Sequence, residues 1–521
     1  MITQMKTNIT ILSLLGLLIF ATSGCSDWLE TRPEGEIIIE EYWKTESDAL
    51  QVLTGCYKVM AEGGYMDRVM VWGEGRSDNV TLGSVPTELN DILNQELEET
   101  NGYTDWTYFY RVINYCNTLL RFAPEAQKID DNFTMESLRS MEAEAMAIRA
   151  LSYFYLVRAF DNVPYITEPS VDGNQEFLYP QTKGSVILDS LVSDLNIAVR
   201  WAKDQHVSLP ATKGRFTKAS INALLADIHL WRGDYNACIN ACDQVLSNPS
   251  LTLVKAETML SRVFYYGNSS ESIFELQYED DKLENVMTKR FHGWGGNILP
   301  FFTFPANLVL TQYSPFNFQV GAGYTESKED FRAKDFIINN PTVSIYRIFK
   351  YAGASRREDA SGESSTYSYR MNTSNWIFYR LSDVILMKAE ALLQRDKAAG
   401  IEPVLKLVNQ TYLRSNPDAD SLRSTYYSGI NEIENLILRE RQRELMFEGK
   451  RYFDLMRMAI RNGNTSDVTN YLSKTSSSTE LYGNMSTIES LYWPINKKEL
   501  IANPLLKQNP FYENTYKTAS N

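Results

Sequence analysis

Histidine and cysteine are scarce in this chain of 521 residues, and their spacing limits the metal and redox chemistry to be expected. The three histidines lie far apart and show no HExxH-type spacing, which argues against a histidine-rich metal centre. The five cysteines contain no CxxC pair, so neither a zinc site nor a dithiol redox centre is indicated. Cys238 and Cys242 lie four apart in a helical pattern, which is typical of small thiols packed in a core. We predict no metal site and no cofactor.

Positive charge is also in deficit. Lys and Arg number 51 against 65 Asp and Glu, which gives a net charge of −14. Such a chain repels a phosphate backbone, and no long run of Lys or Arg reverses this locally. Nucleic acid is therefore not an expected partner.

Two further patterns are missing. After residue 25 no segment reaches about 18 consecutive apolar residues, so no membrane-spanning helix is predicted there. No Ser-His-Asp or Cys-His arrangement is visible, and we predict no enzymatic activity. What is present is ordinary globular composition with 12% aromatic residues, including 31 Tyr and 9 Trp, which leaves rings available to stack on ligands.

The first 25 residues indicate export and lipid attachment. Lys6 precedes an apolar run, Ile9 to Phe20, that is too short for a permanent membrane span, so residues 1–24 are predicted to be a signal peptide. The following small residues lead to Cys25 and resemble the lipobox of bacterial lipoproteins, which makes Cys25 the expected lipidation site. Ser26, Asp27 and Glu30 resemble a short acidic tag for surface export. The alternative is an ordinary signal peptide with Cys25 free.

Helical periodicity runs through most of the remaining chain. Apolar and small residues form one face of a helix over 134–160, which Pro164 bars from continuing, and a second face spans 188–202. Gly233 separates helical patterns over 221–231 and 235–245, and this pair resembles a tetratricopeptide repeat. Further pairs are predicted near 381–408, with Pro403 in a first turn, and near 433–456. Such units bury their apolar faces only by stacking, so a solenoid-like scaffold is predicted.

Between about 250 and 375 the helical period is lost. Gly, Asn, Ser, Pro and aromatic residues dominate this stretch, which includes Phe291 to Gly296 and Phe301 to Pro305. We expect a loop-rich insertion on the scaffold, and loops held on a rigid frame are where binding commonly resides.

Six stretches in order resemble the SusD/RagB family of outer-membrane nutrient-binding lipoproteins of Bacteroidetes. They are CSDWLETRPEGEIIIEEYWKTESDALQVLTGCY at 25–57, AEAMAIRALSYFYLVRAFDNVP at 143–164, GRFTKASINALLADIHLWRGDYNA at 214–237, FYRLSDVILMKAEAL at 378–392, ILRERQRELMFEGKRYFDLMR at 437–457 and YWPINKKELIANPLLKQNPFY at 492–512. The resemblance implies an all-α fold of about four tetratricopeptide-type helix pairs with an irregular ligand-binding region packed on it. It further implies a SusD-like N-terminal region over 25–215 and a SusD/RagB C-terminal region over 216–521.

The same resemblance implies a function and partners. Family members bind glycans, or peptides in the RagB branch, and close over a TonB-dependent SusC-like transporter. This chain is accordingly expected on the outer membrane, lipid-anchored and facing the cell exterior. A glycan-binding lipoprotein, a peptide-binding lipoprotein and a protein–protein scaffold remain open alternatives.

One charged run and two aromatic loops are candidate sites. The run Arg439 to Glu444 has opposite charges at helical spacing, and we interpret it as a structural ion-pair network and not as an acid/base pair. Sugar binding calls for flat rings and planar polar groups. Two glycine-containing stretches offer both, and the predicted ligand-binding residues are Trp72, Arg76, Asp78, Asn79 and Trp294. The alternatives are a loop-closing hydrogen-bond cluster for Arg76, Asp78 and Asn79, and burial against the frame for Trp294.

Overall fold

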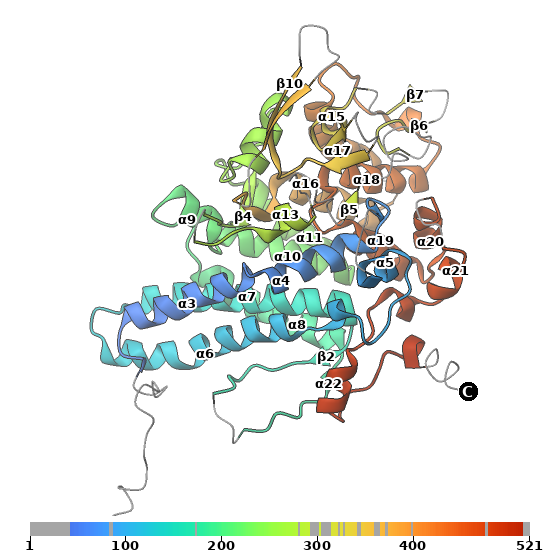
Figure 1. Ribbon diagram of the computed structural model, residues 1–521. Coiled ribbons are helices and arrows are strands. Elements are labelled where there is room, and N and C mark those ends of the chain that lie inside the picture. The colour runs from blue at the N-terminus through green and yellow to red at the C-terminus, as the bar shows by residue number, and fades with distance from the viewer. Residues whose placement is uncertain are drawn as a thin grey trace, which may run out of the picture.

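Long helices from the first half of the chain pack side by side at one end of the molecule (Figure 1). The computed structural model describes residues 42–82, 87–171, 175–279, 282–291, 302–303, 314–320, 324–326, 329–340, 345–358, 365–369, 373–397, 400–474 and 478–513. The long helices of this end are α3 (Glu46–Met60), α6 (Thr107–Ile129), α7 (Met135–Phe160) and α8 (Gly184–Trp201). Helix α7 packs against the other three, and nearly all its residues after Ala143 are buried. It is therefore the central helix of this end.

Local sequence signals set the ends of these helices. Thr45 and Asp48 form a capping box at the start of α3, and the Thr134 side chain accepts a hydrogen bond from the Ser137 N–H at the start of α7. Helix α10 (Lys218–Arg232) ends at Gly233, whose φ of 78° is the left-handed conformation that glycine adopts without steric cost. The predicted helix over 134–160 and the predicted break at Gly233 are confirmed.

The described helices include four tetratricopeptide-type pairs. The pairs are α7 with α8, α10 with α11 (Tyr235–Leu246), α16 (Leu381–Arg395) with α17 (Ile401–Ser415), and α18 (Ile430–Leu445) with α19 (Arg451–Asn462). Helix α11 packs on α16, and α16 packs on α18, so the pairs stack into one scaffold. Pro403 lies in the first turn of α17, as predicted. The fold is thus all-α, as the sequence indicated.

Shorter helices fill the space between the pairs and along the edges. They are α4 (Gly63–Met70), α5 (Thr87–Leu93), α9 (Leu209–Gly214), α12 (Ala256–Met259), α13 (Val286–Arg290), α15 (Phe331–Asp335), α20 (Ser466–Leu472), α21 (Leu481–Asn484) and α22 (Lys497–Ala502). Along the part of the chain that the structure describes, no helix combines the length and apolar character needed to cross a membrane.

The strands form short antiparallel pairs. The main pair joins β4 (Ser272–Leu276) to β12 (Trp376–Arg380), and both strands are fully buried. The others are β1 (Thr81–Leu82) with β5 (Phe302–Thr303), β2 (Val163–Pro164) with β3 (Gln181–Thr182), β6 (Gln319–Val320) with β7 (Tyr324–Thr325), β8 (Ile337–Asn340) with β9 (Ile345–Ile348), and β10 (Gly353–Glu358) with β11 (Ser365–Tyr369).

The β4–β12 pair marks where the loop-rich stretch leaves the scaffold and returns to it. Strand β4 precedes this stretch, and β12 follows it and runs directly into α16. We call the chain between the two strands, residues 277–375, the excursion. Its described residues hold hairpins and short helices, so the stretch is more regular than the sequence indicated. In Figure 1 its elements β6, β7, β10 and α15 lie at the end of the molecule opposite α6 and α8, while α13 and β5 lie nearer the middle.

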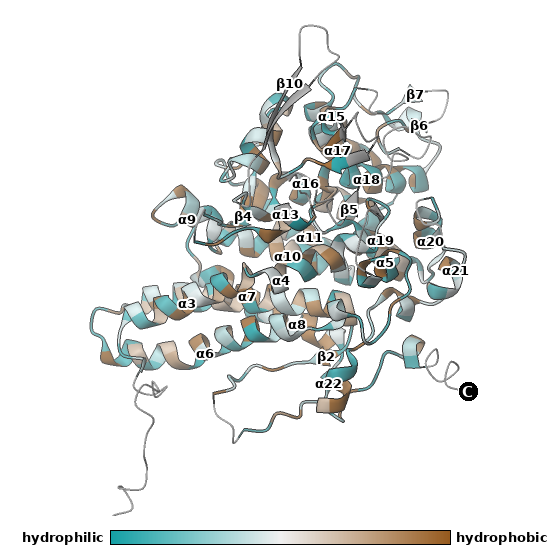
Figure 2. Ribbon diagram, in the orientation of Figure 1, coloured by the Kyte–Doolittle hydropathy of each residue, from teal (hydrophilic) through white to brown (hydrophobic). Residues whose placement is uncertain are grey.

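Apolar contact holds these parts together. One large cluster of buried apolar residues runs through the stacked helices, and a second cluster lies between α16, α17 and α18. Figure 2 shows brown and teal positions interspersed along single helices, as expected for helices that bury one side and expose the other. The large cluster also includes Phe336, Ile348 and Tyr351, so the excursion packs on the stacked helices.

Candidate ligand-binding site

The four predicted ligand residues between 72 and 79 lie in the protein interior. Trp72 belongs to a π-helical turn, Val71–Gly75, and is fully buried, with its ring stacked on Phe109 at 4.8 Å between centroids. Its indole Nε1 donates to the carbonyl oxygen of Tyr103 at 2.9 Å. Gly73 does not make this stretch flexible. It allows close packing, because a Cβ at this position would collide with the backbone of Gly449. Trp72 is therefore a core residue.

Arg76, Asp78 and Asn79 are also buried, and each bonds to a distant part of the chain. Arg76 donates to the carbonyl oxygens of Ser490 and Leu491 at 3.0 and 2.6 Å. Asp78 pairs with Arg451 at 2.7 Å, and the Oδ1 atom of Asn79 accepts from Gln442 at 2.8 Å. The expectation of a glycine-loosened, ligand-binding loop at 72–79 is therefore wrong, because these side chains are buried. The contacts are also more than the loop-closing cluster that the sequence left as the alternative, since these partners lie far along the chain.

Two other sequence-predicted residues, Trp294 and Cys25, lie outside the described residues. Ligand binding by Trp294 and lipidation of Cys25 therefore stay predictions.

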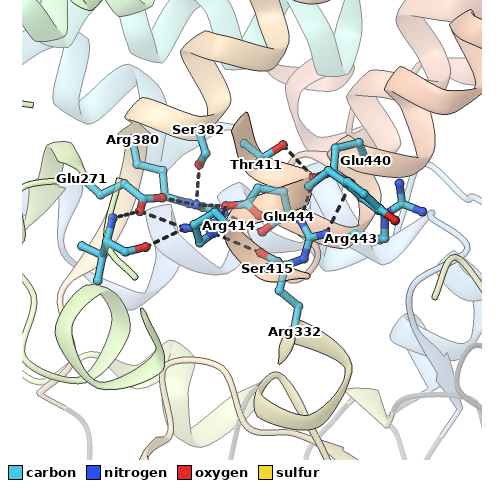
Figure 3. A network of polar contacts seen from close by, with 12 residues as sticks. Glu271, Arg332, Arg380, Ser382, Thr411, Arg414, Ser415, Glu440, Arg443 and Glu444 are labelled. Carbon is cyan, nitrogen blue, oxygen red and sulfur yellow. Dashed lines mark hydrogen bonds and ion pairs between the residues drawn. The ribbon is translucent and has the colours of Figure 1, made fainter. Parts of the chain in front are cut away.

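The charged run of α18 is the centre of a buried ion-pair network, which Figure 3 shows from close by. Arg380 pairs with Glu271, Glu444 and Glu448 at 2.6–2.7 Å. Most partners come from other elements, whereas the sequence interpretation expected pairs along one helix. The Arg443–Glu440 pair at 2.8 Å is an exception, since both residues belong to α18. The network is structural, as predicted, but most of its ion pairs join different helices and strands.

The network lowers the pKa of two of its carboxylates, those of Glu444 and Glu448. Burial alone would raise the pKa of Glu444, but Arg414, Arg380 and Arg332 outweigh it and hold that pKa well below the usual range. Arg380 and Lys350 likewise lower the pKa of Glu448 against the effect of burial. A general acid needs a carboxyl group that is protonated near neutral pH, and neither of these two groups meets that requirement. Among the described residues no group of three or more His, Cys, Asp or Glu is placed to hold a metal ion.

The same network anchors the excursion to the scaffold at two points. Glu326, directly after β7, accepts from Arg439 at 2.9 Å, from Arg443 at 3.0 Å and from the Tyr427 hydroxyl at 3.0 Å. Asp330 caps α15 and bonds to Arg332, which in turn pairs with Glu440 and Glu444 of α18 at 2.8 and 2.7 Å. Strand β7 and helix α15 are therefore held against α18 by charge-assisted bonds in a dry interior.

Between these anchors lies a cavity of about 390 Å³, which we call the tyrosine groove. Its lining consists of Tyr324, Thr325, Glu329, Phe331, Lys334, Tyr412, Asn416, Pro417, Asp418, Ala419 and Asp420. The hydroxyls of Tyr324 and Tyr412 share a hydrogen bond of 2.9 Å. The Tyr324 ring also stacks on Tyr426, with centroids 4.3 Å apart and planes 19° apart. Both stacked rings are partly exposed, and Tyr324 is the one of the two that lines the groove.

Asn416 gives the groove an unused acceptor. Its Nδ2 donates to Asp330 at 3.0 Å and to the carbonyl oxygen of Tyr412 at 2.9 Å. Its Oδ1 is buried and has no hydrogen-bond partner among the described residues. A buried acceptor without a donor costs about 1–3 kcal/mol, so a ligand that donates to this atom would recover that free energy.

Two larger cavities lie elsewhere and are less suited to a sugar ring. One of about 640 Å³ lies beside α9 and is lined mainly by Ser, Thr, Asn and aliphatic residues, with no Tyr, Phe or Trp. One of about 580 Å³ lies between the end of α7 and residues 488–513, and its lining rings are Phe160, which is buried, and Tyr492. Neither combines a stacked pair of partly exposed rings with an unpartnered buried acceptor. The tyrosine groove is therefore the better candidate, although the sequence analysis did not single out its residues.

Comparison with known proteins identifies the family. Residues 266–512 match the model of the SusD family, and residues 27–230 match a model described as starch-binding associating with outer membrane. The chain is a member of the SusD-like family. Outer-membrane association and a link to starch binding are thus properties of its family. The predicted division at 215/216 stays a prediction, since the two matches leave residues 231–265 between them.

Relatives in this SusD-like family align over most of the chain. SusD-like protein P38 of Formosa agariphila is 26% identical, covering 97% of this chain and 99% of the relative. A SusD superfamily protein from Bacteroides vulgatus ATCC 8482 has a crystal structure similar to this one, with a TM-score of 0.73 and 20% identity, covering 90% of this chain and 100% of that one. A further crystal structure, of a putative sugar binding protein from the same organism, gives a TM-score of 0.68 at 21% identity and covers 90% and 99%. These structural similarities establish the shared fold.

Proposed function

We propose that this SusD-like protein captures oligosaccharides at the cell surface and delivers them to a TonB-dependent SusC-like transporter in the outer membrane. The lipid at Cys25 is its membrane attachment in this proposal. The observation that carries the binding role is the tyrosine groove, which is lined by the partly exposed Tyr324 and by Asn416 with its unpartnered amide oxygen.

The groove suits a sugar because its two kinds of surface match the two kinds of surface on a pyranose. The ring of Tyr324, which is backed on one face by Tyr426, can cover the apolar C–H face, while Asn416 and the carboxylates at the rim accept from ring hydroxyls. The anchors at Glu326 and Asp330 hold these groups in place before a ligand arrives, which lowers the entropy cost of binding.

Calorimetry with a panel of oligosaccharides tests this role. Tyr324→Ala should weaken binding about fivefold or more, because a stacked ring contributes about 1 kcal/mol. Tyr482→Ala is a matched control, since Tyr482 is 59% exposed on α21 and does not line the groove. If both variants bound as tightly as the parent, the groove would not be the binding site.

The panel also separates the alternatives. An oligopeptide that binds the parent protein while no glycan does would move the substrate to the peptide branch of the family. Binding of neither class, together with stable binding of another protein, would favour the scaffold function.

We propose binding without catalysis. Glu440 and Glu444 of α18 are paired with arginines, and these partners hold the pKa of Glu444 well below its usual range, which supports this proposal. Purified protein should leave oligosaccharides and peptides intact over long incubation. Turnover that tracked the protein through purification, and that vanished on mutating one carboxylate, would contradict it.

Attachment and delivery are tested in cells. Cys25→Ala should remove the palmitate label and release the protein from the membrane. A tandem purification from detergent-solubilised outer membranes should recover a large β-barrel transporter with the parent protein. Retention of the label in the Cys25→Ala variant would refute lipidation at this residue.

A further inference from the structure

The charge balance of the tyrosine groove bears on which glycans it accepts. Three exposed carboxylates line it, from Glu329, Asp418 and Asp420, against one ammonium group, from Lys334. The lining therefore has an excess of two negative charges. The whole chain adds to the effect with its net charge of −14.

Three buried arginines near the groove do not offset this excess, because carboxylates already pair with them. Arg332, next to the lining residue Phe331 on α15, is fully buried and pairs with Asp330, Glu440 and Glu444. Arg439 and Arg443 of α18 both pair with Glu326. A buried guanidinium held by two or more oxygens has little field left for a ligand.

The polar groups of the groove are also mostly acceptors. The carboxylates accept only, and the free atom of Asn416 is its Oδ1, since its Nδ2 is already bonded. A ligand must therefore supply donors. Hydroxyl groups do so, whereas a carboxylate or sulfate ester brings further acceptors and like charge.

From this arrangement we infer that the groove selects oligosaccharides without anionic groups and discriminates against uronate-bearing or sulfated ones. The inference rests on the proposed function, because it names the ligand class of the same site. Discrimination comes from an unfavourable charge placed against the wrong ligand, in addition to favourable contacts with the right one.

Matched ligand pairs that differ in charge test this selectivity by calorimetry at low ionic strength. Suitable pairs are methyl-esterified and saponified oligogalacturonate, carboxyl-reduced and native oligoalginate, and desulfated and native carrageenan oligosaccharides, with maltooligosaccharides as a neutral addition. In each pair that binds, the neutral member should bind about fivefold tighter or more. We call the ratio of the two affinities, neutral over charged, the gap. This gap should narrow in about 0.5 M salt, which screens exposed charges.

A charge-matched pair of variants locates the effect. Asp418→Asn with Asp420→Asn should narrow the gap about threefold or more at low salt, because losing the two charges favours the anionic member over the neutral one. Asp131→Asn with Glu136→Gln changes the net charge equally at the start of α7, far from the groove, and should leave the gap unchanged.

The outcomes distinguish the two proposals. Tighter binding of an anionic member, lost in Tyr324→Ala, would overturn the charge preference while the glycan-binding function stands. An equal change of the gap in both double variants would overturn the assignment to the groove. Binding of no glycan by the parent protein would overturn the proposed function, and the inference with it.

Discussion

Beside the second half of α7 the interior holds a group of packed aromatic rings, whereas beside the second half of α18 it holds a network of paired charges. Tyr155 of α7 lies among Phe109, Phe378 and Phe453, with ring centroids about 6 Å apart. On α18, by contrast, the six consecutive polar residues from Arg439 to Glu444 are all buried. Any close apolar neighbour stabilises a buried ring, whereas a buried charge is tolerated only beside a partner of opposite charge. The aromatic part therefore depends on filled volume, and the charged part depends on complete pairing.

The largest effect is expected from breaking the charged part. Arg380→Ala leaves Glu271, Glu444 and Glu448 without the guanidinium that they share, and it should lower the free energy of unfolding by about 4 kcal/mol. Urea unfolding followed by circular dichroism measures this loss. Arg121→Ala is the control, because the Arg121–Glu125 pair is exposed on α6 and should contribute less than about 1 kcal/mol. Equal losses in the two variants would remove the distinction between buried and exposed pairs.

A somewhat smaller effect is expected from opening the aromatic part. Tyr155→Ala creates a cavity among packed rings and should cost about 3 kcal/mol of unfolding free energy, seen as a lower melting temperature. Glycan affinity of the folded fraction should stay within about twofold, because Tyr155 does not line the tyrosine groove. A large loss of affinity at unchanged stability would show that the repeat helices take part in binding.

A third effect concerns Glu74, which lies where the two parts meet. Its carboxylate accepts from Asn79 at 2.7 Å and from the Phe447 N–H at 2.8 Å, but burial dominates and raises its pKa from 4.5 to about 7. Because the folded state holds this proton more tightly than the unfolded state, the free energy of unfolding should fall as pH rises. Between pH 6 and pH 8 the loss should be about 1.4 kcal/mol.

The comparison of parent and Glu74→Gln isolates this effect. Burial lowers the pKa of His206 and of His229, so their contributions have the opposite sign, and subtraction of the two stability curves removes them. A difference curve that is flat between pH 6 and pH 8 would refute the raised pKa of Glu74.

The smallest effect is expected from Trp294→Ala, which we predict to leave the packing of both the aromatic part and the charged part unchanged. We predict a loss of about 1 kcal/mol in glycan binding, roughly fivefold in affinity, with an unchanged melting temperature. Calorimetry and thermal unfolding of the same preparation measure both quantities. A lowered melting temperature at unchanged affinity would mean that Trp294 packs against the scaffold.

The helices could be predicted from the sequence because their signals are local. The apolar period of α7, its end before Pro164 and the break at Gly233 all depend on residues within a few turns of one another. The tyrosine groove could not, since Tyr324 and Tyr412 are 88 residues apart and no periodicity relates them. The error at Asp78 and Asn79 has the same origin, because their partners Arg451 and Gln442 lie more than 360 residues away. Glycines near these residues suggested an open loop, whereas Gly73 is small because another backbone passes beside it.

The β4–β12 pair allows the excursion to be exchanged as one unit, and in this sense we call it a cassette. Its two ends sit opposite each other, with Leu276 facing Trp376, so evolution can lengthen or rewrite the intervening chain at an entropy cost that grows only slowly with length. The exchange is not free, however. Arg332 and Lys350 lie inside the cassette, and they neutralise Glu440, Glu444 and Glu448 of the scaffold. A transplanted cassette that lacked these two cations would leave the three carboxylates with fewer partners, since among the described scaffold residues only Arg443, Arg414 and Arg380 would still pair with them. New specificities are therefore less costly when they arise around this fixed pair of basic residues.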